Sequence, residues 1–93
     1  MAHFTLAPGT TSNAVVHRTV EEIWYVVGGA GEMWRKLGDH EETVVLAPGT
    51  CVTIPVGAHF QFRATGAEAL SAVAITMPPW PGDDEALAVT GRW

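Results

Sequence analysis

The sequence predicts an all-β fold, and three observations support this prediction. Eight short runs rich in β-branched and aromatic residues are separated by Gly, Pro, Asn or Asp, the spacing typical of a β-sandwich or barrel. Gly, Pro or β-branched residues interrupt every candidate helix of ten or more residues. The pentapeptide LAPGT occurs at 6–10 and again at 46–50. We therefore expect two equivalent halves of four strands each, arranged as a double Greek-key jelly roll.

The expected strands follow one another closely from residue 3 to residue 77. They are 3–6, 13–17, 22–27 and 31–36 in the first half, and 43–46, 51–54, 59–64 and 70–77 in the second. Each half opens with LAPGT, in which Pro suits the second position of a tight turn and Gly supplies the positive φ of the third.

The tail, residues 78–93, begins with three prolines around Trp80. It is expected to leave the barrel as an extended segment, with a short turn from Asp83 to Leu87. We expect this segment to wrap over a sheet or to exchange onto a partner subunit.

Composition limits the classes of function. A chain of 93 residues that is 47% hydrophobic and 16% charged is expected to form one compact domain, residues 1–93. The net charge of −5 and the lack of a basic run argue against binding to nucleic acid or to an anionic membrane. No apolar run approaches the ~18 residues needed to span a bilayer. The single cysteine, Cys51, and the absence of signal-peptide features at the N-terminus predict a soluble, cytoplasmic protein.

Two stretches have the spacing of a known pair of motifs, one running from the first LAPGT and one from the second. The matching residues are Gly9, His17, Glu22 and Gly29 in the first motif, and Gly49, Pro55 and Gly57 in the second. With these residues the chain resembles the cupin superfamily. The resemblance implies a small barrel of the double-stranded β-helix, or jelly-roll, type.

The resemblance also implies a metal site of three His and one Glu, of which only part is present. When the chain is aligned with the motifs of the family, His17 takes one histidine position of the first motif and Glu22 its glutamate position. Val15 takes the other histidine position. In the second motif, Phe60 takes the histidine position and Ala64 the asparagine position.

A metal would need a third donor. His59 lies one residue before the family position, which in a strand turns its side chain to the opposite face. A bulge near residues 55–58 would return it to the interior and complete a site of His17, Glu22 and His59. His40 and Cys51 are the other possible donors. The cofactor is therefore either absent or one divalent transition metal, Fe, Mn, Ni, Cu or Zn.

Without a metal, the same two side chains suit acid–base catalysis. Period-2 alternation places apolar residues on the inward side together with Glu22. The candidate pocket residues are Val15, Trp24, Val26, Phe60, Phe62 and Ala64. An imidazole and a carboxylate in such a cavity are suited to general acid–base catalysis on a small molecule.

Other polar and aromatic residues are expected on the surface. Glu21 should face solvent at the rim, and Gln61 and Arg63 should lie on the outer face of their strand. Exposed aromatic residues mark contact surfaces, and the candidates are Trp34, Trp80 and Trp93. We expect a homodimer formed by sheet packing or by an exchanged N-terminal strand.

The sequence favours a small-molecule enzyme in which Glu22 or His17 is the general base of an isomerisation, elimination or cyclisation. One alternative is a mononuclear metal-dependent cupin such as a dioxygenase. The other is a pocket that binds a small ligand without turning it over.

Overall fold

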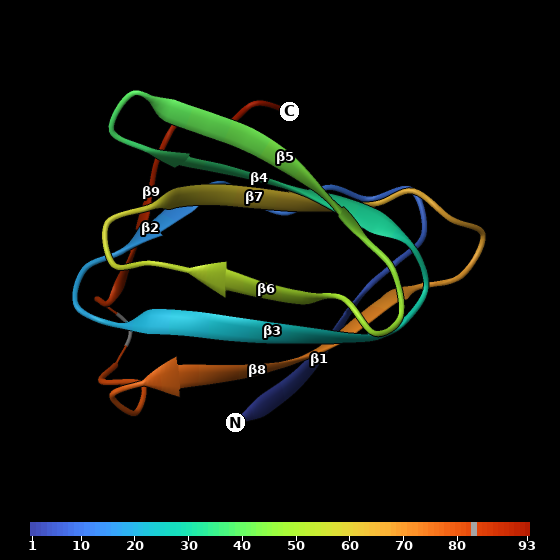
Figure 1. Ribbon diagram of the computed structural model, residues 1–93, viewed down its shortest axis with the longest axis horizontal. Helices are drawn as coiled ribbons and strands as arrows, with labels where there is room; N and C mark the ends of the chain where they lie inside the picture. The colour runs from blue at the N-terminus through green and yellow to red at the C-terminus, as the bar shows by residue number, and fades with distance from the viewer. Residues whose placement is uncertain (83) are drawn as a thin grey trace.

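The computed structural model describes residues 1–82 and 84–93, which form two antiparallel β-sheets that face each other across a common core (Figure 1). The first sheet has the order β1 (Ala2–Leu6), β8 (Leu70–Met77), β3 (Glu21–Gly28) and β6 (Cys51–Ile54). The second has the order β5 (His40–Leu46), β4 (Gly31–Leu37), β7 (His59–Ala64), β2 (Val15–His17) and β9 (Ala86–Ala88). The described residues contain no helix long and apolar enough to cross a membrane. The predicted all-β jelly roll is confirmed.

The two LAPGT segments form the same corner. Gly9 has a φ of +74° and Gly49 a φ of +91°, the left-handed region that glycine adopts without steric cost. In each corner the threonine amide donates to the alanine carbonyl three residues earlier, at 3.2 Å in the first and 2.9 Å in the second. The repeat therefore marks the equivalent turn of each half.

Strand β3 shows the predicted alternation most clearly. Glu22, Trp24 and Val26 are buried, whereas Tyr25 and Val27 are exposed on the other side of the sheet. Because successive side chains of a strand point to opposite faces, the strand contributes one row to the core and one to the outer surface. All eight predicted strands are present, and β5 begins three residues earlier than expected, at His40.

The tail departs from the prediction. Asp84 lies in a turn and Glu85 in a bend, but residues 86–88 form β9, which pairs with β2, where a turn as far as Leu87 was expected. The start of the predicted turn, Asp83, lies outside the described residues. The tail thus wraps onto a sheet of its own chain.

Beyond β9 the tail crosses the outer face of the second sheet and buries residues that were expected to be exposed. Gln61 is 5% exposed because its side-chain amide exchanges two hydrogen bonds with the backbone of Trp93, at 2.9 and 3.2 Å. The Arg63 guanidinium lies 4.1 Å from the centre of the Trp93 ring. Trp34, expected on an exposed contact surface, is 4% exposed and donates to Glu41 at 2.6 Å.

Candidate functional site

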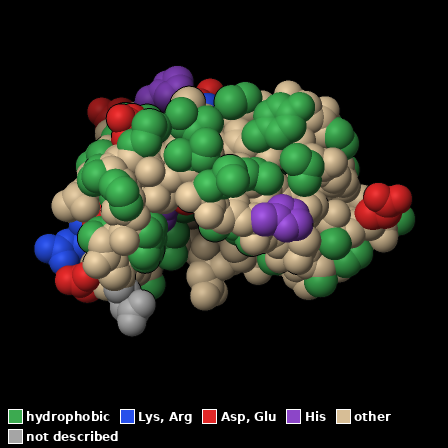
Figure 2. Space-filling model, turned by 90° about the horizontal axis from the view of Figure 1, so that it is seen from below, with side chains coloured by type: hydrophobic (Ala, Val, Ile, Leu, Met, Phe, Trp, Pro, Cys, Tyr) green, Lys and Arg blue, Asp and Glu red, His purple; other side chains and the backbone are tan. Residues whose placement is uncertain are grey.

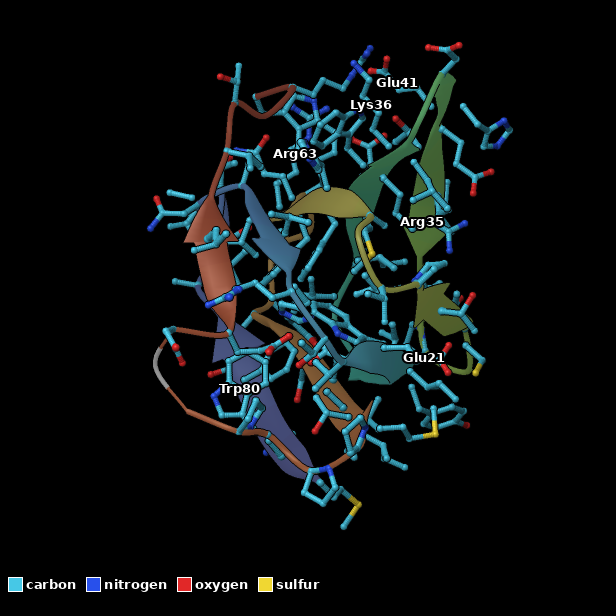
Figure 3. The ribbon with its side chains drawn as sticks, turned by 90° about the vertical axis from the view of Figure 1, so that its left-hand side faces the viewer. Glu21, Arg35, Lys36, Glu41, Arg63 and Trp80 are labelled. Carbon is cyan, nitrogen blue, oxygen red and sulfur yellow. The ribbon has the colours of Figure 1, made fainter. Side chains whose placement is uncertain are left out.

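The two candidate acid–base residues lie at one end of the barrel, where β2 ends and β3 begins. His17 is the last residue of β2 and is 5% exposed, and Glu22 is the second residue of β3 and is 8% exposed. Glu21, by contrast, is exposed as expected. In Figure 3, which looks at this end of the molecule, Trp80 lies on the tail on one side and Glu21 on the opposite side.

His17 is enclosed by aromatic rings. Its imidazole packs edge to face against Phe60, with ring centres 5.0 Å apart, and against Trp80, with ring centres 5.1 Å apart. Its Nδ1 atom is buried and has no hydrogen-bond partner among the described residues. An unpaired buried polar atom costs about 1–3 kcal/mol and is rare in folded proteins. This nitrogen is therefore a candidate contact for a ligand or a reacting group.

Glu22 lies beside a cavity of about 300 Å³. Its Oε2 accepts a hydrogen bond from Nε1 of Trp24 at 2.8 Å, and the described residues provide no other hydrogen bond or ion pair to this carboxylate. The cavity wall is formed by β1, β3, β8 and the tail, through Met1, Ala2, Phe4, Glu22, Ala74, Thr76, Pro79 and Trp80. Trp80 therefore borders the cavity and also covers His17. No hydrogen bond joins His17 to Glu22 in the described structure.

The predicted pocket residues belong to the hydrophobic core rather than to the wall of this cavity. Four are buried, with 0–4% of their surface exposed: Trp24, Val26, Phe60 and Ala64. Val15 and Phe62 are partly buried and pack against the same core. Of these, Trp24 contacts the site directly through its hydrogen bond to the Glu22 carboxylate, and the Phe62 ring packs 4.7 Å from the Trp24 ring.

Glu85 is a buried residue of this region that sequence reasoning missed. It is 3% exposed, and its carboxylate accepts hydrogen bonds from the Thr19 hydroxyl at 2.6 Å and from the amides of Thr19 and Val20 at 2.6 and 3.0 Å. Burial alone would raise the pKa of Glu85, but these hydrogen bonds and the nearby His17 lower it below its ordinary value of 4.5. Glu85 therefore anchors the tail to the turn between His17 and Glu22.

The donors at this end do not fit the metal site that the family resemblance implies. Val15 and Phe60 occupy two ligand positions and pair with each other directly across β2 and β7. His59, the suggested third donor, lines a groove on the outer face with Trp34 and Lys36. The other possible donors, His40 and Cys51, are exposed. Within residues 1–82 and 84–93, no three His, Cys, Asp or Glu side chains come together as a metal site would need.

The outer face of the first sheet carries several exposed hydrophobic side chains. Figure 2 looks onto this face and shows hydrophobic side chains spread across it. The exposed large hydrophobic residues of β3 and β8 are Tyr25, Val27, Ile75 and Met77, with 40–52% of their surface exposed. This face suits the sheet packing expected of a homodimer, which stays a prediction.

Comparison with known proteins gives the same fold. A family model described as a cupin domain matches residues 2–76. No curated protein matches the chain by sequence. Among solved structures, the capsular polysaccharide assembling protein CapF from Staphylococcus aureus is 20% identical, with a TM-score of 0.78. An oxalate decarboxylase from Lactobacillus farciminis, solved as a formate complex, is 19% identical, with a TM-score of 0.84. The CENP-C cupin domain of Drosophila melanogaster is 13% identical, with a TM-score of 0.75.

These similarities concern the fold alone. The matches cover 94% of this chain but 27% of the CapF chain and 25% of the oxalate decarboxylase chain. For the CENP-C domain they cover 80% of this chain and 54% of the other. The chain thus spans about a quarter to a half of the length of these proteins.

Proposed function

The chain belongs to the cupin domain family, and we propose that it uses the end of its barrel to bind a small apolar molecule and to move a proton on it. Glu22 is the proton acceptor and His17 the second acid–base group. The reaction class is an isomerisation, elimination or cyclisation. The single observation that carries the proposal is that Glu22 presents a buried carboxylate with one hydrogen-bond partner to a cavity of about 300 Å³.

The surroundings of Glu22 suit a general base. The Trp24 indole donates to one oxygen at 2.8 Å, and the carboxylate keeps further lone pairs that can accept from a substrate in the cavity. A carboxylate positioned in this way and shielded from water can contribute roughly 10²- to 10⁴-fold to a proton transfer.

His17 is the second acid–base group of the proposal, and it lies behind Trp80 rather than in the cavity wall. Its unpaired Nδ1 can accept or donate a proton, and Trp80 restricts the access of water to the imidazole. In an isomerisation, Glu22 takes a proton from a C–H bond, the electron pair of that bond shifts into a new double bond as the neighbouring double bond opens, and the protonated Glu22 returns the proton at the far end. In an elimination, the protonated Glu22 instead gives its proton to the leaving group. Each version conserves protons and electrons and consumes no oxidant.

Hydrogen–deuterium exchange at carbon tests the proposal before the substrate is known. A panel of small apolar carbon acids in D₂O is followed by NMR for loss of C–H signal, with and without a metal chelator. We expect exchange that survives chelation and falls about 100-fold or more in Glu22→Gln. Glu41→Gln is the matched control, because Glu41 also accepts a tryptophan Nε1–H, from Trp34, but on the outer face.

The other two functions predict different results. Exchange that disappears with chelator and returns with added metal would support a metal-dependent cupin. A compound that binds at Glu22 and is recovered without exchange or conversion would support a non-catalytic binding module. Full exchange in Glu22→Gln would contradict the role of Glu22 as the base.

A further inference from the structure

We propose that the ligand of this site is a small organic cation, with an ammonium group beside an apolar body. The inference rests on the proposed function for the location of the site, but its test requires binding only. It follows from one feature of the cavity, a buried carboxylate enclosed by aromatic and aliphatic walls.

The charge of Glu22 has no counterpart among the described side chains that line the cavity. No lysine, arginine or histidine lines it, and the Met1 amino group, although Met1 belongs to the lining, makes no described ion pair with Glu22. Buried charges in proteins are normally paired, because an isolated one loses its hydration without compensation. The hydrogen bond from Trp24 is neutral and leaves the negative charge in place. A cationic ligand would supply the missing charge.

The walls of the cavity also favour a cation. The rings of Phe4 and Trp80 line it, and the Trp24 ring lies 4.6 Å from that of Phe4, between centres. Aromatic rings attract a desolvated ammonium group through their quadrupole. The same rings, with Ala74 and Pro79, offer apolar surface to the rest of the ligand. A molecule of one ring with a short amine side chain is small enough for about 300 Å³.

The distribution of charge over the whole protein points the same way. The net charge is −5, which draws cations toward the surface and repels anions. Arg63 and Arg92 lie on the outer face of the second sheet, where they pair with Glu32 and Glu41 at 2.7 and 4.0 Å. In Figure 3, Arg63 lies well apart from Trp80. The basic side chains of that face are therefore too distant to balance Glu22.

A cationic nitrogen would also serve the proposed chemistry. A positive charge makes the C–H bonds next to it more acidic, because it stabilises the electron pair left when the proton departs. The carboxylate that attracts the nitrogen would then lie beside the proton to be removed.

Three probes of nearly equal size test the inference by calorimetry at low ionic strength and neutral pH: benzylamine, benzyl alcohol and benzoate. We expect benzylamine, which is protonated under these conditions, to bind at least tenfold more tightly than benzyl alcohol, and benzoate to bind most weakly. In Glu22→Gln the preference for the amine over the alcohol should fall to about twofold or less. Glu41→Gln should keep the full preference, and Trp80→Leu should weaken amine binding more than Trp80→Phe.

Equal binding of the amine and the alcohol by the unmodified protein would overturn the inference, and this comparison needs no variant to fold. An equal loss of preference in Glu41→Gln and Glu22→Gln would also overturn it, because the effect would then be one of overall charge. The two proposals fail separately. Proton exchange without any preference for cations leaves only the proposed function standing, and a preference for cations without proton exchange leaves only this inference.

Discussion

Restoring the two missing histidines should turn the end of the barrel into a metal centre. We predict that the double variant Val15→His, Phe60→His binds one divalent zinc, cobalt or nickel ion together with His17 and Glu22. The two positions pair directly across β2 and β7, and the Phe60 ring centre lies 5.0 Å from that of His17. Two imidazoles bound tetrahedrally to one zinc ion, with Zn–N distances of about 2.0–2.1 Å, have ring centres about 5 Å apart. An imidazole in place of the Phe60 ring therefore has the right separation from His17.

The stability of this variant depends on the loss caused by replacing Phe60 and on the gain from bound metal. Phe60 is 4% exposed and belongs to the core, so that a smaller and polar side chain there costs about 2–4 kcal/mol without metal. For a domain of this size, each kcal/mol lowers the melting temperature by about 4–8 °C. Metal at a hundredfold excess over its Kd returns about 2.7 kcal/mol, which is most of that loss.

The assay is thermal melting with and without metal, with the stoichiometry measured by elemental analysis. The double variant should melt lower than the unmodified protein without metal and recover most of the difference with metal. Adding His17→Ala to the double variant should abolish the recovery. A folded double variant that shows neither bound metal nor a metal-dependent rise in melting temperature would refute the alignment of Val15 and Phe60 with the ligand positions.

Two further predictions concern the framework of the site. Gly29→Ala should cost at least twice as much stability in urea as Gly9→Ala, for which we expect about 1–2 kcal/mol. Both glycines have similar φ values, +76° and +74°, but a Cβ at Gly29 would lie 2.3 Å from the Ala69 carbonyl oxygen, whereas one at Gly9 meets open space. Equal losses would contradict the close approach at Gly29. Glu85→Gln should destabilise the protein at pH 7 more than at pH 3. The folded pKa of Glu85 is lowered, so its contribution is present above pH 4.5 and is lost as the pH falls through the folded value. If Glu85→Gln lowers the urea midpoint by the same amount at pH 7 and at pH 3, the ionised form of Glu85 does not provide this stability.

The strands were predictable because their signals are local. Alternation in residues 22–27 and the paired LAPGT turns depend on neighbours in sequence, and both match the structure. The burial of His17 and Glu22 also agrees with the inward positions that alignment with the family motifs gave them. Their immediate partners could not be derived in this way, because Trp80 reaches His17 from a segment 63 positions further along the chain.

The tail explains most of what sequence reasoning missed. Residues 86–88 read Ala-Leu-Ala, too short and too weakly β-forming to indicate a strand, and they become one by pairing with β2. Gln61 was assigned to an exposed face because alternation gives only the side of the sheet, and the cover that buries it comes from Trp93. Glu85 carries no local signal of burial, since its hydrogen-bond donors, Thr19 and Val20, are 66 and 65 residues away.

The two tryptophan–glutamate hydrogen bonds give this protein a built-in pair of spectroscopic probes. The indole N–H groups of Trp24 and Trp34 both donate to carboxylates, the first at the end of the barrel and the second on its outer face. A strong hydrogen bond shifts an indole proton resonance, so these two signals should stand apart from those of Trp80 and Trp93. A compound that engages Glu22 would move the Trp24 resonance, while Trp34 would serve as the internal reference. One nitrogen-edited spectrum per compound could therefore sort a chemical library by where each member binds.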